Sequence, residues 1–211
     1  MSGLFITLEG GDGAGKTTHL GYVKDWFDKK GRPLIVTREP GGTAVGEKIR
    51  HILLHSETGE VSSETELLLM FAARKQHVEE VILPDLSEGI SVLCDRFTDA
   101  SFAYQGAGRG IDLQRILYLE NWIHGNLQPD LTLLFDVDIE TASERANARE
   151  SNDRFDSENA AFKERVRQGY LSRAKHSSER MKLIDASLSI EEIHKDLAQV
   201  LDNLLCERLL T

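Results

Sequence analysis

The sequence has few cysteines, no long apolar run and no excess of positive charge. Its two cysteines, Cys94 and Cys206, fit no disulfide framework and no zinc-binding pattern, so we expect two reduced thiols and a cytoplasmic protein. No apolar stretch approaches about 18 residues, so we expect neither a membrane span nor a signal peptide. The formal net charge of −10 argues against a nucleic-acid-binding protein, because such a protein presents a basic surface.

Apolar runs and helical patterns alternate over the 211 residues, a length that predicts one domain spanning residues 1–211. Runs typical of buried strands cover residues 4–8, 33–37, 90–94, 131–136 and 181–184. Helical patterns cover residues 17–30, 43–55, 64–83, 112–124, 139–149, 158–180 and 189–208. This order predicts an α/β fold whose five-stranded parallel sheet carries helices on both faces.

One glycine-rich segment predicts a phosphate-binding loop. It reads Gly10-Gly11-Asp12-Gly13-Ala14-Gly15-Lys16-Thr17 and fits G-x-x-x-x-G-K-[ST] at every required position. A predicted strand precedes it and a predicted helix follows, so backbone N–H groups and a helix N-terminus point at one anion. We expect Lys16 to reach the β- and γ-phosphates of a nucleotide and Thr17 to ligate Mg²⁺. The glycine spacing does not fit the dinucleotide fingerprint.

Arginines at the predicted strand ends indicate which class of nucleotide-binding protein carries this loop. The sequence contains no Asn-Lys pair, so it lacks the guanine signature of GTPases, and it is short for a large motor. A phosphoryl acceptor that is itself a phosphate needs cations around it rather than a base. Arg38, Arg96, Arg149 and Arg154, together with Lys16, fit that requirement. Arg149 and Arg154 lie among acidic residues, where a solvated surface charge is the alternative interpretation.

The segment 64–83 carries an arginine on an otherwise apolar helix face. Leu67, Phe71, Arg74 and Val78 follow a spacing that places them on one side of a helix. A buried arginine needs acceptors, and a carbonyl-rich base stacked on Phe71 would supply them. Alternatively, Phe71 belongs to the core and Arg74 reaches a neighbouring carboxylate. The spacing alone leaves both interpretations open.

Three motifs together resemble the thymidylate kinase family over essentially the whole chain. The first motif runs from Glu9 to Thr18, the second is Thr37-Arg38-Glu39-Pro40-Gly41-Gly42-Thr43, and the third is Asp95-Arg96 followed by Ser101 and Ala103-Tyr104-Gln105-Gly106. The resemblance implies a nucleoside-monophosphate-kinase core that phosphorylates dTMP to dTDP with ATP and Mg²⁺. It also implies a homodimer and a short lid near residues 147–160.

For the acceptor, the resemblance implies that Arg38 and Arg96 hold the monophosphate and that Arg50 lines the same pocket. Asp12 should lie near the 3′-hydroxyl, and Tyr104 should crowd the 2′ side of the sugar.

For the base, the resemblance implies that Phe71 stacks on thymine and Arg74 bonds a ring oxygen. Ser101 and Gln105 should complete this pocket.

For the donor, the resemblance implies that Asp95 orients the Mg²⁺ shell with Thr17 and that Arg145 stacks on adenine. The phosphate-binding loop lacks an arginine, so Arg149 and Arg154 of the lid should stabilise the transferring phosphoryl group, as in the bacterial branch of the family. The residues expected to bind ATP are Gly10, Gly11, Asp12, Gly13, Ala14, Gly15, Lys16, Thr17, Thr18 and Arg145.

Two other functions are compatible with parts of this pattern. One is a kinase for a different nucleoside monophosphate. The other is a nucleotide-dependent regulator that hydrolyses slowly, although the base-pocket residues would then have no purpose. The isomer of the Glu39–Pro40 bond stays open.

Overall fold

The computed structural model describes residues 3–55, 60–147, 154–155 and 157–210. Its five strands form one parallel sheet, as the sequence predicts, and the strand order is β2-β3-β1-β4-β5. The strands are β1 (Phe5–Glu9), β2 (Leu34–Arg38), β3 (Ser91–Asp95), β4 (Leu131–Asp136) and β5 (Met181–Asp185). The first three begin and end one residue later than predicted, and β4 matches its prediction.

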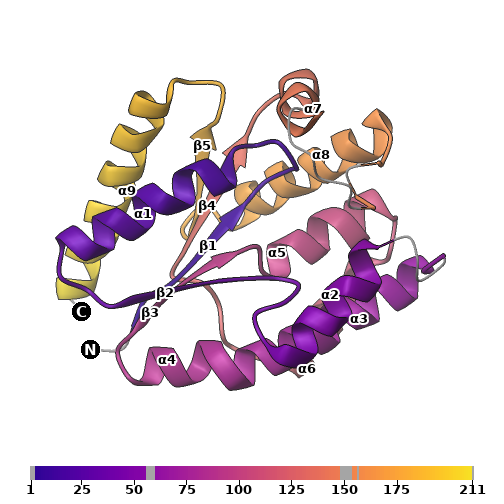
Figure 1. Cartoon of the computed structure of the whole chain (residues 1–211), viewed down its shortest axis with the longest axis horizontal. Coiled ribbons are helices and arrows are strands. Elements are labelled where there is room, and N and C mark those ends of the chain that lie inside the picture. The colour runs from indigo at the N-terminus through magenta and orange to yellow at the C-terminus, as the bar shows by residue number, and fades with distance from the viewer. Residues whose placement is uncertain (1–2, 56–59, 148–153, 156, 211) are drawn as a thin grey trace.

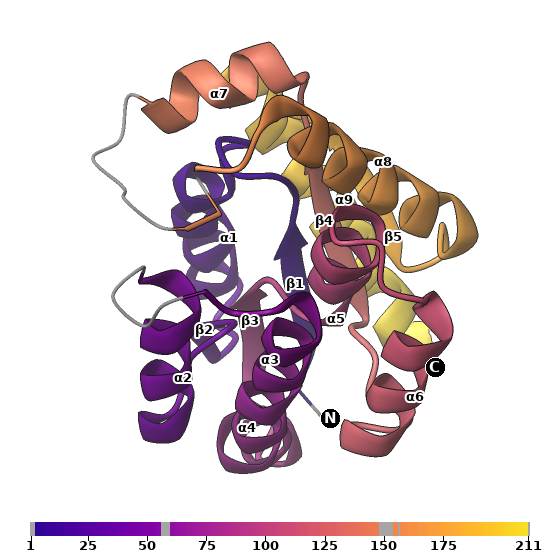
Figure 2. The ribbon, with the colours of Figure 1, turned by 90° about the vertical axis from the view of Figure 1, so that its right-hand side faces the viewer.

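Helices follow the strands along the chain and cover both faces of the sheet (Figure 1). The α-helices are α1 (Lys16–Lys29), α2 (Ala44–Leu54), α3 (Ser63–His77), α4 (Leu83–Ser87), α5 (Thr98–Ser101), α6 (Leu113–Ile123), α7 (Ile139–Asn147), α8 (Ala160–His176) and α9 (Ile190–Leu210). Two π-helical segments, η2 (Val78–Ile82) and η3 (Phe102–Gly108), continue α3 and α5. Helices α1 and α9 lie side by side in Figure 1, and α2 lies against α3 in Figure 2.

Alternating side chains of β1 point to opposite faces of the sheet and pack in two different apolar clusters. Ile6 and Leu8 join the cluster that contains Val23 of α1 and Leu197 of α9. Phe5 points the other way and joins the cluster under η2 and β3. Burial of apolar area on both faces is the main stabilising contribution to such a sheet, and it explains why β1 is apolar almost throughout.

The segment 98–108 is helical although its sequence pattern did not predict a helix. The run is short and its later half is interrupted by Gly106 and Gly108, so it carries little local signal. Tertiary packing against α8 holds it in place. A Cβ at Gly169 of α8 would lie 2.7 Å from the Cβ of Ala107, so glycine there allows the two helical segments to approach closely. This segment presents Ser101, Tyr104 and Gln105.

The predicted lid is only partly within the described chain. Helix α7 ends at Asn147 and α8 begins at Ala160, whereas residues 148–153 and 156 lie outside the described residues. The Glu39–Pro40 peptide bond is cis, which answers the question that the sequence left open. Among the described helices, none is both long and apolar enough to cross a membrane.

Candidate active site

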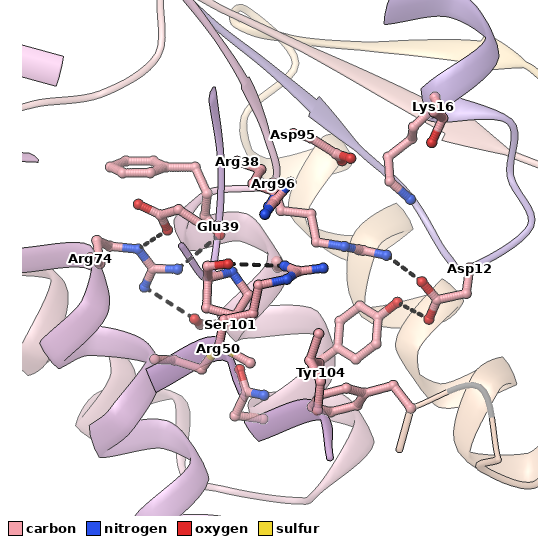
Figure 3. A pocket seen from close by; sticks show the side chains of 18 of the residues that line it. Asp12, Lys16, Arg38, Glu39, Arg50, Arg74, Asp95, Arg96, Ser101 and Tyr104 are labelled. Carbon is pink, nitrogen blue, oxygen red and sulfur yellow. Dashed lines mark hydrogen bonds and ion pairs between the residues drawn. The ribbon is translucent and has the colours of Figure 1, made fainter. Parts of the chain in front are cut away.

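A pocket of about 280 Å³ opens at the carboxyl ends of the strands. This is where ligands bind to open parallel sheets. Figure 3 shows two groups of side chains in it, with Asp12, Arg96 and Tyr104 on one side and Glu39, Arg74 and Ser101 on the other. The predicted site residues that line the pocket are Asp12, Gly13, Gly15, Lys16, Thr17, Arg38, Arg50, Arg74, Asp95, Arg96, Ser101, Tyr104 and Gln105.

The phosphate-binding loop lies between β1 and α1 in a glycine-dependent conformation. Gly13 has a φ of 81°, and a Cβ there would lie 2.0 Å from the backbone oxygen of Ala142, so only glycine fits. The Lys16 Nζ crosses the loop and donates hydrogen bonds of 2.9 Å to the backbone oxygens of Gly10 and Gly11. Burial, reinforced by the charge of Arg96, lowers the pKa of Lys16 to about 8.

Arg96 follows β3 and connects that strand end to the loop. Its φ of 72° is a left-handed value that a non-glycine residue seldom adopts, so the surrounding contacts must hold it. The guanidinium donates to the Gly10 oxygen at 2.8 Å and to the Tyr170 hydroxyl at 3.0 Å. Its Nη2 donates to Asp12 Oδ1 at 2.6 Å.

Asp12 therefore lies between two cations and a hydroxyl. The Tyr104 hydroxyl donates to its Oδ2 at 2.8 Å. Burial opposes ionisation of this carboxyl, but the charges of Arg96 and Lys16 and the hydrogen bond from Tyr104 outweigh it and hold the pKa of Asp12 below its ordinary value. The side chain is consequently a hydrogen-bond acceptor near neutral pH.

Arg74 sits at the other end of the pocket and is only 2% exposed. Its Nε donates to Glu39 Oε2 at 2.7 Å, and its Nη1 and Nη2 donate to Ser101 Oγ and the Phe97 oxygen, both at 3.1 Å. Glu39 also pairs at 3.0 Å with His77 Nδ1. Arg74 thus reaches a carboxylate, as one of the two sequence interpretations proposed, and it lines the pocket as well.

Phe71 lies behind Arg74, with the guanidinium carbon 4.6 Å from its ring centroid. It is 2% exposed, packs in the cluster of Leu67 and Ile116, and is not among the described residues that line the pocket. Stacking of a base on Phe71 stays a prediction.

The remaining predicted arginines are in different surroundings. Arg38 ends β2, is half exposed and donates to Glu47 at 3.0 Å, and Arg50 donates to the Pro40 oxygen at 2.9 Å. Arg145 of α7 donates to the Ala186 oxygen after β5 at 2.9 Å.

Of the two predicted lid arginines, Arg154 lies within the described residues, and its hydrogen bonds go to the α2–α3 region rather than to the phosphate-binding loop. Arg154 lies against α3, where its Nη2 donates to Glu66 Oε2 at 2.5 Å and its Nε to the Leu53 oxygen at 3.2 Å. Arg149 lies outside the described residues.

Asp95 and Thr17 are suited to a magnesium ion that is held mainly by nucleotide phosphates. Both line the pocket, and Asp95 Oδ1 is a buried oxygen without a hydrogen-bond partner among the described residues. Magnesium bound to a nucleotide needs only one or two protein oxygens and otherwise keeps water and phosphate ligands. The described residues contain no cluster of three or more histidine, cysteine or acidic side chains able to hold a metal alone.

Sequence reasoning assigned no role to several buried partners of these residues. Glu9 at the end of β1 accepts from the Tyr170 hydroxyl at 2.7 Å and from the Phe97 N–H at 2.7 Å. Burial and the nearby charge of Asp99 raise the pKa of Glu9 to about 7. Glu39 belongs to the second of the three family motifs, whereas no local sequence pattern identifies Glu66 or Tyr170.

Comparison with known proteins agrees with this geometry. The family model described as thymidylate kinase matches residues 8–197. Thymidylate kinases of Neisseria meningitidis serogroup C and Pseudomonas putida are 52% and 50% identical to the chain over 202 and 205 residues, covering 96% and 97% of it and 98% of each relative. The crystal structure of thymidylate kinase from Ehrlichia chaffeensis superposes with a TM-score of 0.77 at 33% identity, covering 96% of this chain and 99% of that one. The chain therefore belongs to the thymidylate kinase family.

Proposed function

We propose that the chain transfers the γ-phosphoryl group of ATP to dTMP and so produces dTDP for dTTP synthesis. The observation that carries this is the convergence of Lys16, Arg38, Arg50 and Arg96 on one pocket with the phosphate-binding loop. Donor and acceptor phosphates repel each other, and guanidinium groups offset that repulsion while gripping two oxygens each. The acceptor oxygen is already an anion, so no general base is required.

In this proposal the acceptor spans the pocket between Arg96 and Arg74. Arg96 and Arg38 hold its phosphate, Asp12 accepts from the 3′-hydroxyl, and Tyr104 lies against the sugar. Arg74, Ser101 and Gln105 contact the base, with Phe71 beneath it. Figure 3 shows Asp12, Arg96 and Tyr104 across the pocket from Arg74 and Ser101, and this distribution supports the assignment.

The donor half uses the loop and a metal. Backbone N–H groups from Gly10 to Thr18 hold the ATP phosphates, Lys16 neutralises them, and Arg145 lies against the adenine. Thr17 and Asp95 hold Mg²⁺, which supplies charge neutralisation at the transferring phosphate. Arg149 and Arg154 stabilise the transferring group, and for this Arg154 exchanges Glu66 for phosphoryl oxygens when the lid, near residues 147–160, closes.

We further propose that the whole chain acts as one domain in the cytoplasm and forms a homodimer through α6 and the adjoining side of α3. Tyr118 and Trp122 are 69% and 70% exposed there, and Tyr118 lines one surface hollow with the exposed Leu68 of α3. Large exposed apolar patches of this kind mark association surfaces, and a self-complementary patch gives a twofold dimer. Trp122→Glu should shift the sedimentation coefficient toward that of a monomer, and an unchanged coefficient would place the interface elsewhere.

The proposed reaction is tested by a coupled assay that offers dTMP, dUMP, UMP and AMP separately with ATP and Mg²⁺. We expect the highest kcat/KM with dTMP and loss of turnover when EDTA removes the metal. A preference for another monophosphate would reassign the acceptor. ATP hydrolysis that dTMP does not stimulate would favour the slow nucleotide-dependent regulator instead.

A further inference from the structure

Glu66 is a fully buried carboxylate at the first turn of α3, beside the base end of the pocket. Its Oε1 accepts from Gln105 Nε2 at 2.8 Å. Arg109 donates to both carboxylate oxygens, from Nε at 3.3 Å and from Nη2 at 3.2 Å, and Arg154 donates to Oε2. A buried carboxylate surrounded by two guanidinium groups is an acceptor only.

This contact determines which end of the Gln105 amide faces Glu66. A glutamine amide has a donating Nε2 and an accepting Oε1, and the surrounding hydrogen bonds decide its orientation. Because Glu66 can only accept, Nε2 is held against it and Oε1 is left at the opposite corner of the amide. Gln105 is buried and lines the pocket, and the hydrogen bond of its side chain is the one that Nε2 donates to Glu66.

We propose that Glu66 is a positioning residue that sets base specificity by keeping the Gln105 carbonyl oxygen available to the bound base. This inference rests on the proposed function, because it concerns how the acceptor is read. Glu66 does not touch the acceptor itself. It acts through Gln105 and fixes an acceptor group where the base of dTMP carries its N3–H donor.

Arg74 supplies the complementary donor. Three of the five N–H groups of its guanidinium are used by Glu39, Ser101 and the Phe97 oxygen, so two remain. The pocket therefore combines a fixed donor with a fixed acceptor. Thymine presents a C4 carbonyl beside an N3–H and matches this pair, whereas cytosine presents an amino group beside a bare N3 and reverses it.

The orientation of Gln105 does not depend on the lid arginine. Arg109 contacts both oxygens of Glu66 and is itself held by Glu158 and by the ring of Phe162, 4.5 Å from its guanidinium carbon. If Arg154 leaves Glu66 during catalysis, Arg109 still neutralises the carboxylate. The orientation of Gln105 toward the base is therefore independent of whether Arg154 contacts Glu66.

The experiment compares the affinities of dTMP and 5-methyl-dCMP, two ligands that differ only in the C4 group and N3. Glu66→Gln preserves the side-chain volume but introduces a group that donates as well as accepts, so Gln105 is free to turn. Isothermal titration should show dTMP binding weakened about tenfold and the preference for dTMP over 5-methyl-dCMP reduced about tenfold. Glu79→Gln, an exposed charge removal that breaks a surface pair with Lys75, should change neither value.

A double-mutant cycle separates positioning from a merely structural role. In a Gln105→Ala background, Glu66→Gln should no longer reduce the base preference, because the residue through which it acts is gone. Additive effects, or a base preference unchanged by Glu66→Gln alone, would overturn the proposal. Failure of the wild-type enzyme to bind and phosphorylate dTMP would instead overturn the proposed function.

Folding of the variants is followed by thermal unfolding of the same samples. If Glu66→Gln is unfolded at the assay temperature, Glu66→Asp replaces it. The aspartate keeps the negative charge for Arg109 but withdraws the carboxylate by about 1.5 Å, beyond reach of Gln105 Nε2. The same loss of base preference is expected, and an unchanged preference in a folded Glu66→Asp would overturn the proposal.

Discussion

Arg96 and Asp12 are joined by a 2.6 Å hydrogen bond that links the end of β3 to the phosphate-binding loop. The other terminal nitrogen of the Arg96 guanidinium donates to the Tyr170 hydroxyl, and that hydroxyl donates in turn to Glu9. The arginine is consequently oriented by side chains from β1, the loop and α8. Such preorganisation lowers the cost of aligning a cation with an incoming phosphate.

Arg96→Ala should abolish most of the turnover. We expect kcat to fall about 10²- to 10³-fold, since a positioned cation at the acceptor phosphate is lost, while ATP affinity stays near the wild-type value. Arg96→Lys keeps the charge but loses the forked geometry, so an intermediate loss is expected. Steady-state kinetics and ATP titration measure both quantities. Turnover equal to wild type would remove Arg96 from acceptor binding.

Arg154→Ala should reduce kcat about 10³-fold with little change in dTMP affinity. The reason is that the proposed contact with the transferring phosphoryl group forms mainly in the transition state. Arg208→Ala, which removes an exposed arginine paired with Asp130, serves as the control and should leave kcat unchanged. A matching loss of dTMP affinity in Arg154→Ala would contradict a role in the transition state.

Glu39→Ala should destabilise the protein strongly. It leaves the buried charge of Arg74 without its carboxylate, which costs about 3–5 kcal/mol in the free energy of unfolding. Glu47→Ala breaks the exposed pair with Arg38 and should cost less than about 1 kcal/mol. Urea unfolding of both variants makes the comparison, and similar losses would show that burial of the Glu39 pair does not matter.

The raised pKa of Glu9 predicts a pH-dependent contribution to stability. The native protein keeps this proton up to about pH 7, whereas the unfolded chain releases it near the ordinary value of 4.5. The native state binds more protons in this window, so the contribution of Glu9 to stability falls as pH rises from 4.5 to 7 and is constant above. Relative to Glu9→Gln, the wild-type free energy of unfolding should decrease by about 3 kcal/mol across that window.

Urea unfolding at several pH values measures this difference. The comparison with Glu9→Gln cancels the titration of all other groups that the substitution leaves alone. A difference that stays constant, or that increases with pH, would be inconsistent with a raised pKa.

The sequence predicts the alternation of strands and helices well, and it places candidate residues directly after β1, β2 and β3. Because parallel strands bring their carboxyl ends to one edge, Lys16, Arg38 and Arg96 line one pocket. The α/β fold followed from the same alternation, and the comparisons confirm it.

What the sequence could not predict depends on long-range packing. Glu66 and Gln105 are 39 residues apart, and no local pattern indicates that a charged residue on α3 is buried against η3. Likewise, Phe71 and Arg74 share a helix face as predicted, but periodicity gives no information about which of them contacts the pocket. The position of Arg154 on Glu66 depends on a chain connection that has no regular pattern at all.

Gly169 has an ordinary helical backbone, so glycine is present there for the space it leaves and not for its conformational freedom. The next residue along α8 is Tyr170, whose hydroxyl meets both Glu9 and Arg96. A methyl group on residue 169 would lie only 3.0 Å from the backbone of Ala103. The distance between α8 and Ala103 therefore limits how far the Tyr170 hydroxyl extends toward Glu9 and Arg96. One missing methyl group thus determines how closely Tyr170 can approach and support Arg96.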